Sequence, residues 1–409
     1  MLKSEVSRFE LSVRGTDFLA RRAVFRVLKQ LKGVGLTLID HHGDSFQFGD
    51  AHANQQAYII VNNPAFYKRV LKGGSIAAGE AYIDGWWDSP DITEVVRVIA
   101  RNLTLLDRLE EKMSWLTAMQ YKWLHRRRRN SKAVVKQNIL AHYDLGNDFY
   151  RTFLDPNMLY SAAIYDENHE SLFQAQINKM DRLCRQLKLC SSEHLLEIGT
   201  GWGALAIHAA KHYGCMVTTT TISDAQYDWA KSRIEQEGLT GKIILLKQDY
   251  RDLTGQYDKI VSVEMVEAVG KEYLTTYIKK CQSLLKPQGK LAIQAITIAD
   301  QRYESYSKGV DFIQKHIFPG GFLPSITMLA NQLTMHTDFV IRDIKDMGFD
   351  YAKTLSDWHQ KFNASIDTLN KQGFDERFIR MWRFYFSYCE GGFLERRIST
   401  VQLVASRTD

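Results

Sequence analysis

Glu197 and the three glycines that follow it are the residues whose types and spacing first indicate chemistry in this chain. They lie in residues 195–203 (LLEIGTGWG), where Gly199, Gly201 and Gly203 alternate with other residues. Glycine has no Cβ, so the backbone can approach a ligand closely at these positions. Two leucines and an acid before the turn are typical of a buried parallel strand that ends where open α/β sheets bind ligands. The segment therefore predicts a ligand site, with a plain tight turn as the alternative.

The glycine spacing separates two classes of ligand. A dinucleotide site has the spacing Gly-x-Gly-x-x-Gly and an acid after the next strand. Here the spacing is Gly-x-Gly-x-Gly, and the next expected strand, residues 216–220, ends in threonines. These differences favour S-adenosylmethionine (SAM) over a nicotinamide dinucleotide.

The elements that must position this loop alternate between strand and helix from about residue 140 onward. Such alternation predicts an α/β domain with a doubly wound, mostly parallel, Rossmann-like sheet. Residues 285–290 (LKPQGK) predict the end of a helix and a turn before the fifth strand. The expected strands are residues 194–197, 216–220, 243–246, 259–263, 290–296 and 398–405, and the expected helices are residues 204–212, 225–237 and 273–285.

Three parts follow from the chain's organisation. Residues 1–110 are expected to form a smaller N-terminal α/β domain, and residues 111–137 a basic amphipathic helical linker. Residues 138–409 then form the larger α/β domain, which the family resemblance described below implies to be a SAM-dependent, class I methyltransferase domain. The expected strands of the first domain are residues 33–40, 45–48 and 57–61.

The positive charge of the chain is concentrated in the linker. The net charge is +6, and residues 112–137 contain eight Lys and Arg residues and no acid, including the run Arg126–Arg129. Trp115 and Trp123 belong to an apolar stripe at near-helical spacing just before this run. A basic amphipathic helix with aromatic residues is typical of a peripheral, anionic membrane surface. A solvated linker, or a stripe packed against the protein's own core, is the alternative.

Other features of the composition bound the class of protein. Five cysteines are scattered without metal-ligand spacing, so we expect reduced thiols and no metal site. The N-terminus has no apolar signal core, and no apolar run approaches the about 20 residues that span a bilayer. We expect a soluble cytoplasmic protein that associates peripherally with the inner face of the cell membrane. No nucleic-acid recognition fold accompanies the arginines, so no nucleic-acid partner is expected.

Six further blocks make the chain resemble the cyclopropane fatty acid synthase family of SAM-dependent lipid methyltransferases. The match runs from Asn138 to the C-terminus, and the first domain resembles that family's N-terminal region. The blocks, which occur in the family's order, are residues 142–150 (HYDLGNDFY), 158–161 (MLYS), 221–226 (TISDAQ), 248–252 (QDYRD), 317–321 (IFPGG) and 323–325 (LPS).

The resemblance implies an activity and partners. The family transfers a methylene group from SAM to the double bond of an unsaturated acyl chain in a membrane phospholipid, which forms a cyclopropane fatty acid. It also implies that the N-terminal domain contacts lipid and that the protein forms a homodimer. A small-metabolite methyltransferase and a non-catalytic lipid-binding protein are the rival interpretations.

The resemblance also assigns residues to SAM. It places the ribose side of SAM near the block after the second strand, the adenine near Asp249, and the methionine part near a lid-like segment. For Asp249, the alternative is a turn carboxylate that caps the next segment. The cofactor-binding residues carried over in this way are Tyr160, Ser161, Glu197, Gly199, Gly201, Thr221, Gln226 and Asp249.

The same resemblance implies a catalytic set of Glu267, Tyr351 and Gln294. Methyl transfer to a double bond leaves a carbocation, and proton loss from the new methyl group closes the ring. The family's base is a bound bicarbonate; Glu267 and Tyr351 match two residues around it, whereas Gln294 stands for a histidine and Ala162 for a cysteine. An aromatic face such as that of Tyr351 also stabilises a cation. If these residues hold bicarbonate, ring closure follows; if not, Glu267 itself can act as the base, or a methyl-branched alkene results.

Overall fold

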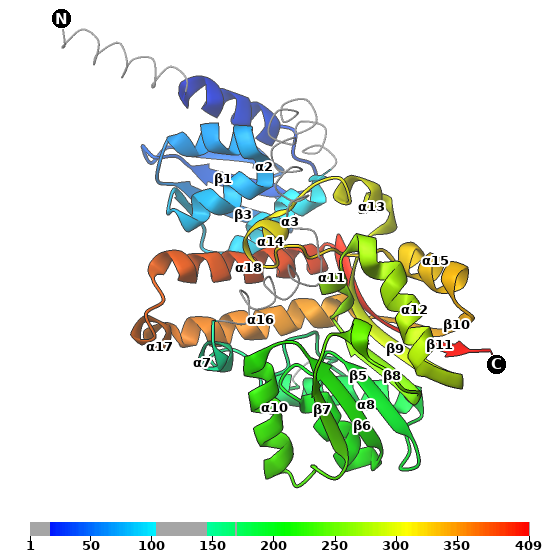
Figure 1. Cartoon of the computed structure of the whole chain (residues 1–409). Coiled ribbons are helices and arrows are strands. Elements are labelled where there is room, and N and C mark those ends of the chain that lie inside the picture. The colour runs from blue at the N-terminus through cyan, green and yellow to red at the C-terminus, as the bar shows by residue number, and fades with distance from the viewer. Residues whose placement is uncertain (1–16, 104–144, 168–169, 409) are drawn as a thin grey trace, which may run out of the picture. The chain divides into compact units, whose positions relative to one another are not determined.

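The computed structural model describes residues 17–103, 145–167 and 170–408, which fall into two compact units (Figure 1). Unit 1 comprises residues 1–124, 309–312 and 370–395, and unit 2 comprises residues 125–308, 313–369 and 396–409. The expected basic linker, with Arg126–Arg129, lies outside the described residues. Among the helices that the structure describes, none has the length and apolar character needed to cross a bilayer.

Unit 1 contains a four-stranded sheet, which accounts for the strands expected in the first domain. Its order is β2-β1-β3-β4; β1 pairs with β3 in parallel, and the other pairs are antiparallel. A turn at Gly43, where φ is +90°, joins the first two strands, as the glycine there predicts. The strands are β1 (Gly35–Ile39), β2 (Ser45–Gly49), β3 (Gln56–Val61) and β4 (Trp87–Asp88).

A helix from the far end of the chain completes unit 1. This helix, α18 (Glu376–Leu394), packs closely on α3: a Cβ placed on Gly391 would come within 2.7 Å of the Val96 side chain. Arg380 donates to the main-chain oxygen of Tyr82 and pairs with Asp88. The sequence division had assigned these residues to the methyltransferase domain, because nothing local shows which core an amphipathic helix joins. The helices of unit 1 are residues 17–28, α2 (Ala65–Ile83), α3 (Ile92–Arg101) and α18.

Unit 2 is built on a seven-stranded sheet that confirms the predicted doubly wound, mostly parallel α/β fold. The order is β10-β11-β9-β8-β5-β6-β7, in which only β11 runs antiparallel to its neighbours. The order reverses between β5 and β8, and such a switch point opens a crevice at the carboxyl ends of the strands. The strands are β5 (His194–Ile198), β6 (Met216–Thr221), β7 (Ile243–Lys247), β8 (Tyr257–Val263), β9 (Leu285–Ile298), β10 (Phe339–Asp346) and β11 (Ile398–Arg407).

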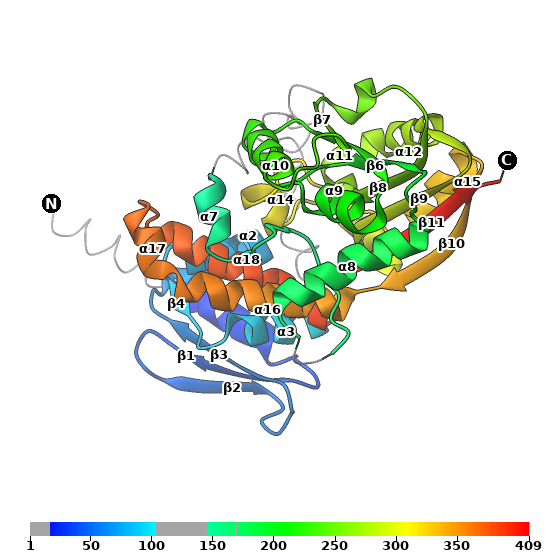
Figure 2. The same cartoon turned by 90° about the horizontal axis from the view of Figure 1, so that it is seen from below.

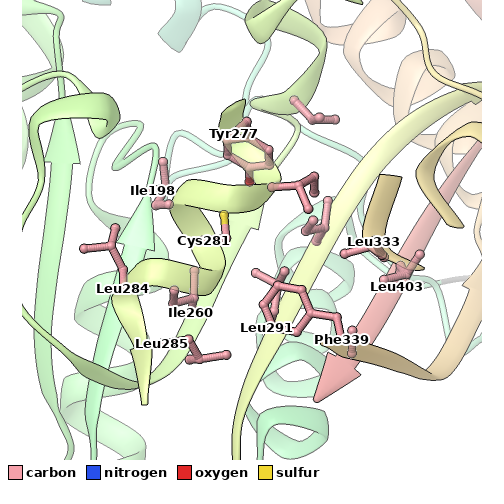
Figure 3. Packing of buried hydrophobic residues seen from close by; sticks show 14 of the residues in the cluster. Ile198, Ile260, Tyr277, Cys281, Leu284, Leu285, Leu291, Leu333, Phe339 and Leu403 are labelled. Atoms are coloured by element: carbon pink, nitrogen blue, oxygen red, sulfur yellow. The ribbon is translucent and has the colours of Figure 1, made fainter. Parts of the chain in front are cut away.

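Helices cover both faces of this sheet (Figures 1 and 2). Leu195 packs with α8, α9 and α10, whereas Leu196 and Ile198 pack with α12 and α15. Figure 3 shows Tyr277 and Cys281 of α12 beside residues of the sheet. The helices of unit 2 that position the site and its core are α7 (Asn147–Arg151), α8 (Leu172–Leu187), α9 (Ala204–His208), the π-helix η1 (Ala209–Tyr213), α10 (Asp224–Gln236), α11 (Val266–Val269), α12 (Leu274–Leu284), α15 (Ile326–His336) and α16 (Gly348–Ala364). The other described helices are η2 (Tyr250–Asp252), η3 (Lys271–Tyr273), α13 (Asp300–Tyr306), α14 (Phe312–His316) and α17 (Ile366–Lys371).

The structure departs from the predicted elements at three places in unit 2. The strand β10 was not predicted, because at the sheet edge it carries charged residues instead of a clear apolar alternation. The predicted turn at residues 285–290 is the start of β9, with an irregular register opposite β8. The helix expected over residues 204–212 changes to a π-helix at Ala209.

Candidate active site

The glycine loop lies between the carboxyl ends of β5 and β6. Its three glycines have positive φ angles of +102°, +52° and +89°, conformations that L side chains rarely adopt. The amides of Gly199 and Thr200 both donate to the Thr220 oxygen, which ties the loop to β6. A Cβ placed on Gly201 would meet no atom within 4 Å, so this position borders open space. The loop thus has both the conformation and the room that a close ligand requires.

Glu197 lies behind the loop and is turned into the protein. Its side chain is buried and accepts a hydrogen bond of 2.6 Å from the Thr219 hydroxyl. Burial raises the pKa of Glu197 to about 8. The carboxyl end of β5 therefore holds an acid with reduced tendency to ionise.

Thr221 and Gln226 meet at the carboxyl end of β6, as expected for one shared contact region. The Thr221 hydroxyl donates to Gln226 Oε1 at 2.9 Å, and both side chains are buried. Asp249 follows β7, and its carboxylate caps the short helix η2 and pairs with Arg251 at 2.6 Å. The capping role of Asp249 is thus present, and its contact with adenine stays a prediction.

The segment at Tyr160 and Ser161 is held by a buried lysine. Lys179 Nζ donates to the Ser161 hydroxyl at 2.7 Å, and Gln176 donates to the Ser161 main-chain oxygen. Lys179 is almost fully buried on α8, which lowers its pKa to about 8. Sequence reasoning missed Lys179, although its place among the apolar residues of α8 was a signal: at the spacing of a buried face, a lysine is unexpected.

Tyr160 belongs to a group of aromatic rings. Its ring centroid lies 5.4 Å from that of Tyr150 and 5.2 Å from that of Trp358. Trp358 in turn lies 6.1 Å from Tyr351, with the two ring planes perpendicular. Tyr351 and Tyr160 are therefore joined through one tryptophan, and the bond from the Tyr351 hydroxyl to Glu264 places this group of rings near the carboxyl end of β8.

Three hydrogen-bond donors from distant segments converge on Glu264, directly after β8. The Ala162 amide and Gln294 Nε2 each donate to Oε1 at 2.8 Å, and the Tyr351 hydroxyl donates to Oε2 at 2.9 Å. The Glu264 amide itself donates to the Gln294 main-chain oxygen. Burial raises the pKa of Glu264, and the three donors act against this rise.

Glu267 lies one turn further, in α11, and has different partners. One of its oxygens accepts a hydrogen bond from the Ile296 amide in β9. Among the described residues, the other oxygen has no hydrogen-bond partner although it is buried. Burial, together with the charge of Glu264, raises the pKa of Glu267 to about 8. Tyr351 and Gln294 are thus brought together at Glu264, not at Glu267, with which the resemblance grouped them.

The Gln294 amide is oriented by a second glutamine. Gln402 of β11 lies opposite Gln294 of β9 in the sheet, and its Nε2 donates to Gln294 Oε1 at 3.0 Å. Both side chains are fully buried. The bond from Gln402 directs the amide nitrogen of Gln294 toward Glu264, because the reversed amide would set two NH₂ groups against each other at Gln402 and two oxygens against each other at Glu264.

The segment with Glu264 and Glu267 lies next to the glycine loop and Glu197. Met265, between Glu264 and Val266, lies against the glycine loop: a Cβ on Gly199 would be 3.4 Å from the Met265 side chain. Lys179 lies within electrostatic range of both Glu264 and Glu197. The arrangement therefore combines a cradle for a ligand with a buried acid–base cluster beside it.

Comparisons with known proteins identify the family and the relatives of this chain. Residues 130–403 match the model of the family described as mycolic acid cyclopropane synthetase. The cyclopropane-fatty-acyl-phospholipid synthase of Escherichia coli K12 is 38% identical over 356 residues, which cover 86% of this chain and 88% of that protein. The tuberculostearic acid methyltransferase UfaA1 of Mycobacterium tuberculosis is 35% identical over 387 residues, covering 93% and 90% respectively.

A solved structure shows the same architecture. The mycolic acid cyclopropane synthase CmaA1, in a complex with SAH and CTAB, superposes with a TM-score of 0.63 and 28% sequence identity. The similarity covers 66% of this chain and 98% of that chain.

Proposed function

The chain belongs to the mycolic acid cyclopropane synthetase family and is a SAM-dependent methyltransferase, and we propose that it acts on the double bond of unsaturated acyl chains in phospholipids. The proposed product is a cyclopropane fatty acid. The observation that carries this proposal is the buried cluster of Glu264, Glu267 and Tyr351 at the carboxyl end of β8. Addition of a methyl group to a neutral alkene leaves a carbocation, and proton loss from this cation forms the proposed product, so the reaction needs a base shielded from water.

The residues around the glycine loop fit SAM. When bound, SAM supplies an electrophilic methyl group on a sulfonium. Gly201 leaves room for its close approach, and Gly199 gives the loop its positive φ beside Met265. Thr221 and Gln226 offer polar atoms at the next strand, and Tyr160 and Ser161 lie on the side toward α8. These residues bind and orient the cofactor in our proposal.

The rest of the site handles the charge that the reaction creates. The rings of Tyr351, Tyr160 and Trp358 present faces that attract a cation, which favours a carbocation over its neutral precursor. The apolar surroundings exclude water that would otherwise capture the cation. A buried carboxylate then accepts the proton.

The membrane part of the proposal rests on the chain's charge. Because the substrate is a phospholipid, the enzyme must reach a membrane surface, and the run Arg126–Arg129 suits anionic headgroups. We place the protein peripherally at the inner face of the cell membrane, with the N-terminal domain in contact with lipid. The homodimer that the resemblance implies stays a prediction.

A second candidate product is a methyl-branched fatty acid formed without ring closure. The similarity to a tuberculostearic acid methyltransferase over 93% of this chain favours it. So does Gln294, which cannot carry a proton or a positive charge.

Mass spectrometry of lipid fatty acids tests both products. The protein is incubated with SAM and unsaturated liposomes, and the released fatty acids are analysed before and after hydrogenation that reduces alkenes but spares the ring. A product that gains CH₂ and resists hydrogenation is expected. A product that gains CH₂ and takes up hydrogen would establish the methyl-branched alternative, and no gain of CH₂ on any lipid would refute the proposed function.

A further inference from the structure

We propose that the Glu264 carboxylate is the resident base of this site and takes the place in which bicarbonate is expected. This inference rests on the proposed function, because it concerns the proton that the product must lose. It starts from the three donors that the structure places on one carboxylate. They come from residues 102, 30 and 87 positions away in the chain, so their convergence is a property of the fold.

The donors around Glu264 do not fit an additional bicarbonate. A bound anion needs N–H or O–H groups aimed at it, and the Ala162 amide, Gln294 Nε2 and the Tyr351 hydroxyl already donate to Glu264. Gln294 Nε2 also donates to the Ala162 main-chain oxygen at 3.2 Å. A further anion would lie beside the buried Glu264 carboxylate, where repulsion between the two negative charges is weakly screened. A carboxylate of the chain itself therefore fills the anion position.

The backbone at Glu264 supports a specific need for its side chain. Its φ is +48°, in the left-handed region, which has a steric cost for any residue with a Cβ. A glycine would adopt this conformation without that cost. Such conformations cluster at functional sites, where the surrounding structure enforces them.

The two neighbouring carboxyl groups divide the charge unequally. Glu264 has three donors and the Lys179 charge to stabilise its ionised form. Glu267 has one donor and one buried oxygen without a partner among the described residues. Two close carboxylates do not readily ionise together, so Glu264 takes the charge and Glu267 stays protonated near neutral pH.

The proton transfer is balanced without any further reactant. One C–H bond of the transferred methyl group breaks, and its electron pair forms the third C–C bond of the ring. The proton passes to Glu264, which becomes a neutral carboxylic acid and returns the proton to water after the product leaves.

Two amide variants separate the roles of the two acids. Glu264→Gln keeps the shape of the side chain but cannot accept a proton, so product formation should fall about 10²–10⁴-fold. Glu267→Gln resembles the protonated acid, and its rate should stay within about tenfold of the original. SAM binding, measured by calorimetry, should be unchanged in both, which shows that they fold. Glu193→Gln, at the amino end of β5 where the carboxylate pairs with Lys259, is a matched control with unchanged activity.

A bicarbonate experiment tests the site's occupant directly. In buffer freed of carbon dioxide, the original protein should keep its full rate of product formation, and added bicarbonate should not raise it. Glu264→Gly, which suits the positive φ and frees the three donors, should lose activity in that buffer and recover part of it when bicarbonate is added.

Each contrary result has one meaning. A rate that depends on bicarbonate in the original protein, a Glu264→Gln variant that keeps its rate, or a loss confined to Glu267→Gln would overturn the inference while leaving the proposed function in place. If the original protein forms no lipid product under any condition, the proposed function fails and the inference falls with it.

Discussion

Two neighbouring strands of the large sheet, β5 and β8, each bring a glutamate to the carboxyl edge, and the two glutamates have different surroundings. Glu197 is buried against Thr219 of the adjacent strand, directly behind a loop whose shape comes from its own glycines. Glu264 takes its partners from a loop, a strand and a helix that are far apart in the chain. The conformation of the cofactor loop thus depends on nine consecutive residues, 195–203, whereas the acid–base cluster forms only when distant segments have folded together.

The difference has a chemical reason. A cofactor is recognised largely through backbone geometry and open space, which glycine provides locally. A base must be desolvated yet kept ionisable, so it needs several donors from different directions. Lys179, whose charge acts on both glutamates, links the two sites.

The largest expected effect on SAM binding comes from a change in the glycine loop alone. Gly201→Val places a β-branched side chain at φ +52° and in the open space beside the loop. We expect SAM affinity to fall about 100-fold or more, since the cofactor would lose its close approach. Calorimetric titration with SAM measures this.

A second glycine provides the control for that variant. Gly238 ends α10 with φ +68° and also has open space around it, so Gly238→Val should lower stability without changing SAM affinity. Equal losses in both variants would mean that strain, and not the cradle, weakens binding.

An intermediate effect is expected from removing the Lys179 charge, which acts on both Glu264 and Glu197. Lys179→Met deletes a cation that lowers the pKa of Glu264 and Glu197, so the pKa of each carboxyl group should rise. Less Glu264 is then ionised at a given pH, and the rising limb of the pH–rate profile moves to higher pH, with about tenfold lower activity at pH 7.

Other titratable groups near Glu264 also affect the pH–rate profile of the Lys179→Met variant. Tyr351 and Glu267 are the titratable groups that also act on Glu264, and neither is altered in the Lys179 variant. A lower rate at every pH, with no displacement of the profile, would show that Lys179 only holds Ser161 in place. Lys179 itself has a pKa lowered to about 8, so the comparison belongs below that pH.

The smallest effect is expected from the outer member of the Glu264 cluster. Gln402→Met keeps the side-chain volume but removes the donor that orients Gln294. One weakened hydrogen bond to a carboxylate costs about 1 kcal/mol, so kcat should fall about fivefold while the KM for SAM stays the same. A rise in KM instead would indicate that β11 supports the cofactor cradle.

Some of the architecture was predictable because it depends on local patterns. Strands rich in apolar residues and separated by helical stretches predicted the parallel sheet, and β5, β6 and β7 are where they were expected. Two features were not predictable: the edge strand β10, and the packing of α18 in unit 1. Charged residues at a sheet edge interrupt the apolar alternation by which a strand is predicted. The apolar face of a helix shows that the helix packs on a core but not which core.

The candidate site also has features that were predictable from the sequence and features that were not. The sequence by itself determined the glycine loop, the acid behind it and the family, because glycines with positive φ and consecutive blocks of residues are encoded locally. Only the tertiary structure decided that Tyr351, Gln294 and the Ala162 amide meet at Glu264 and not at Glu267. Hydrogen-bond partners are set by strand register and helix packing over tens of residues, so three atoms must be brought within 3 Å before the acid they serve can be identified.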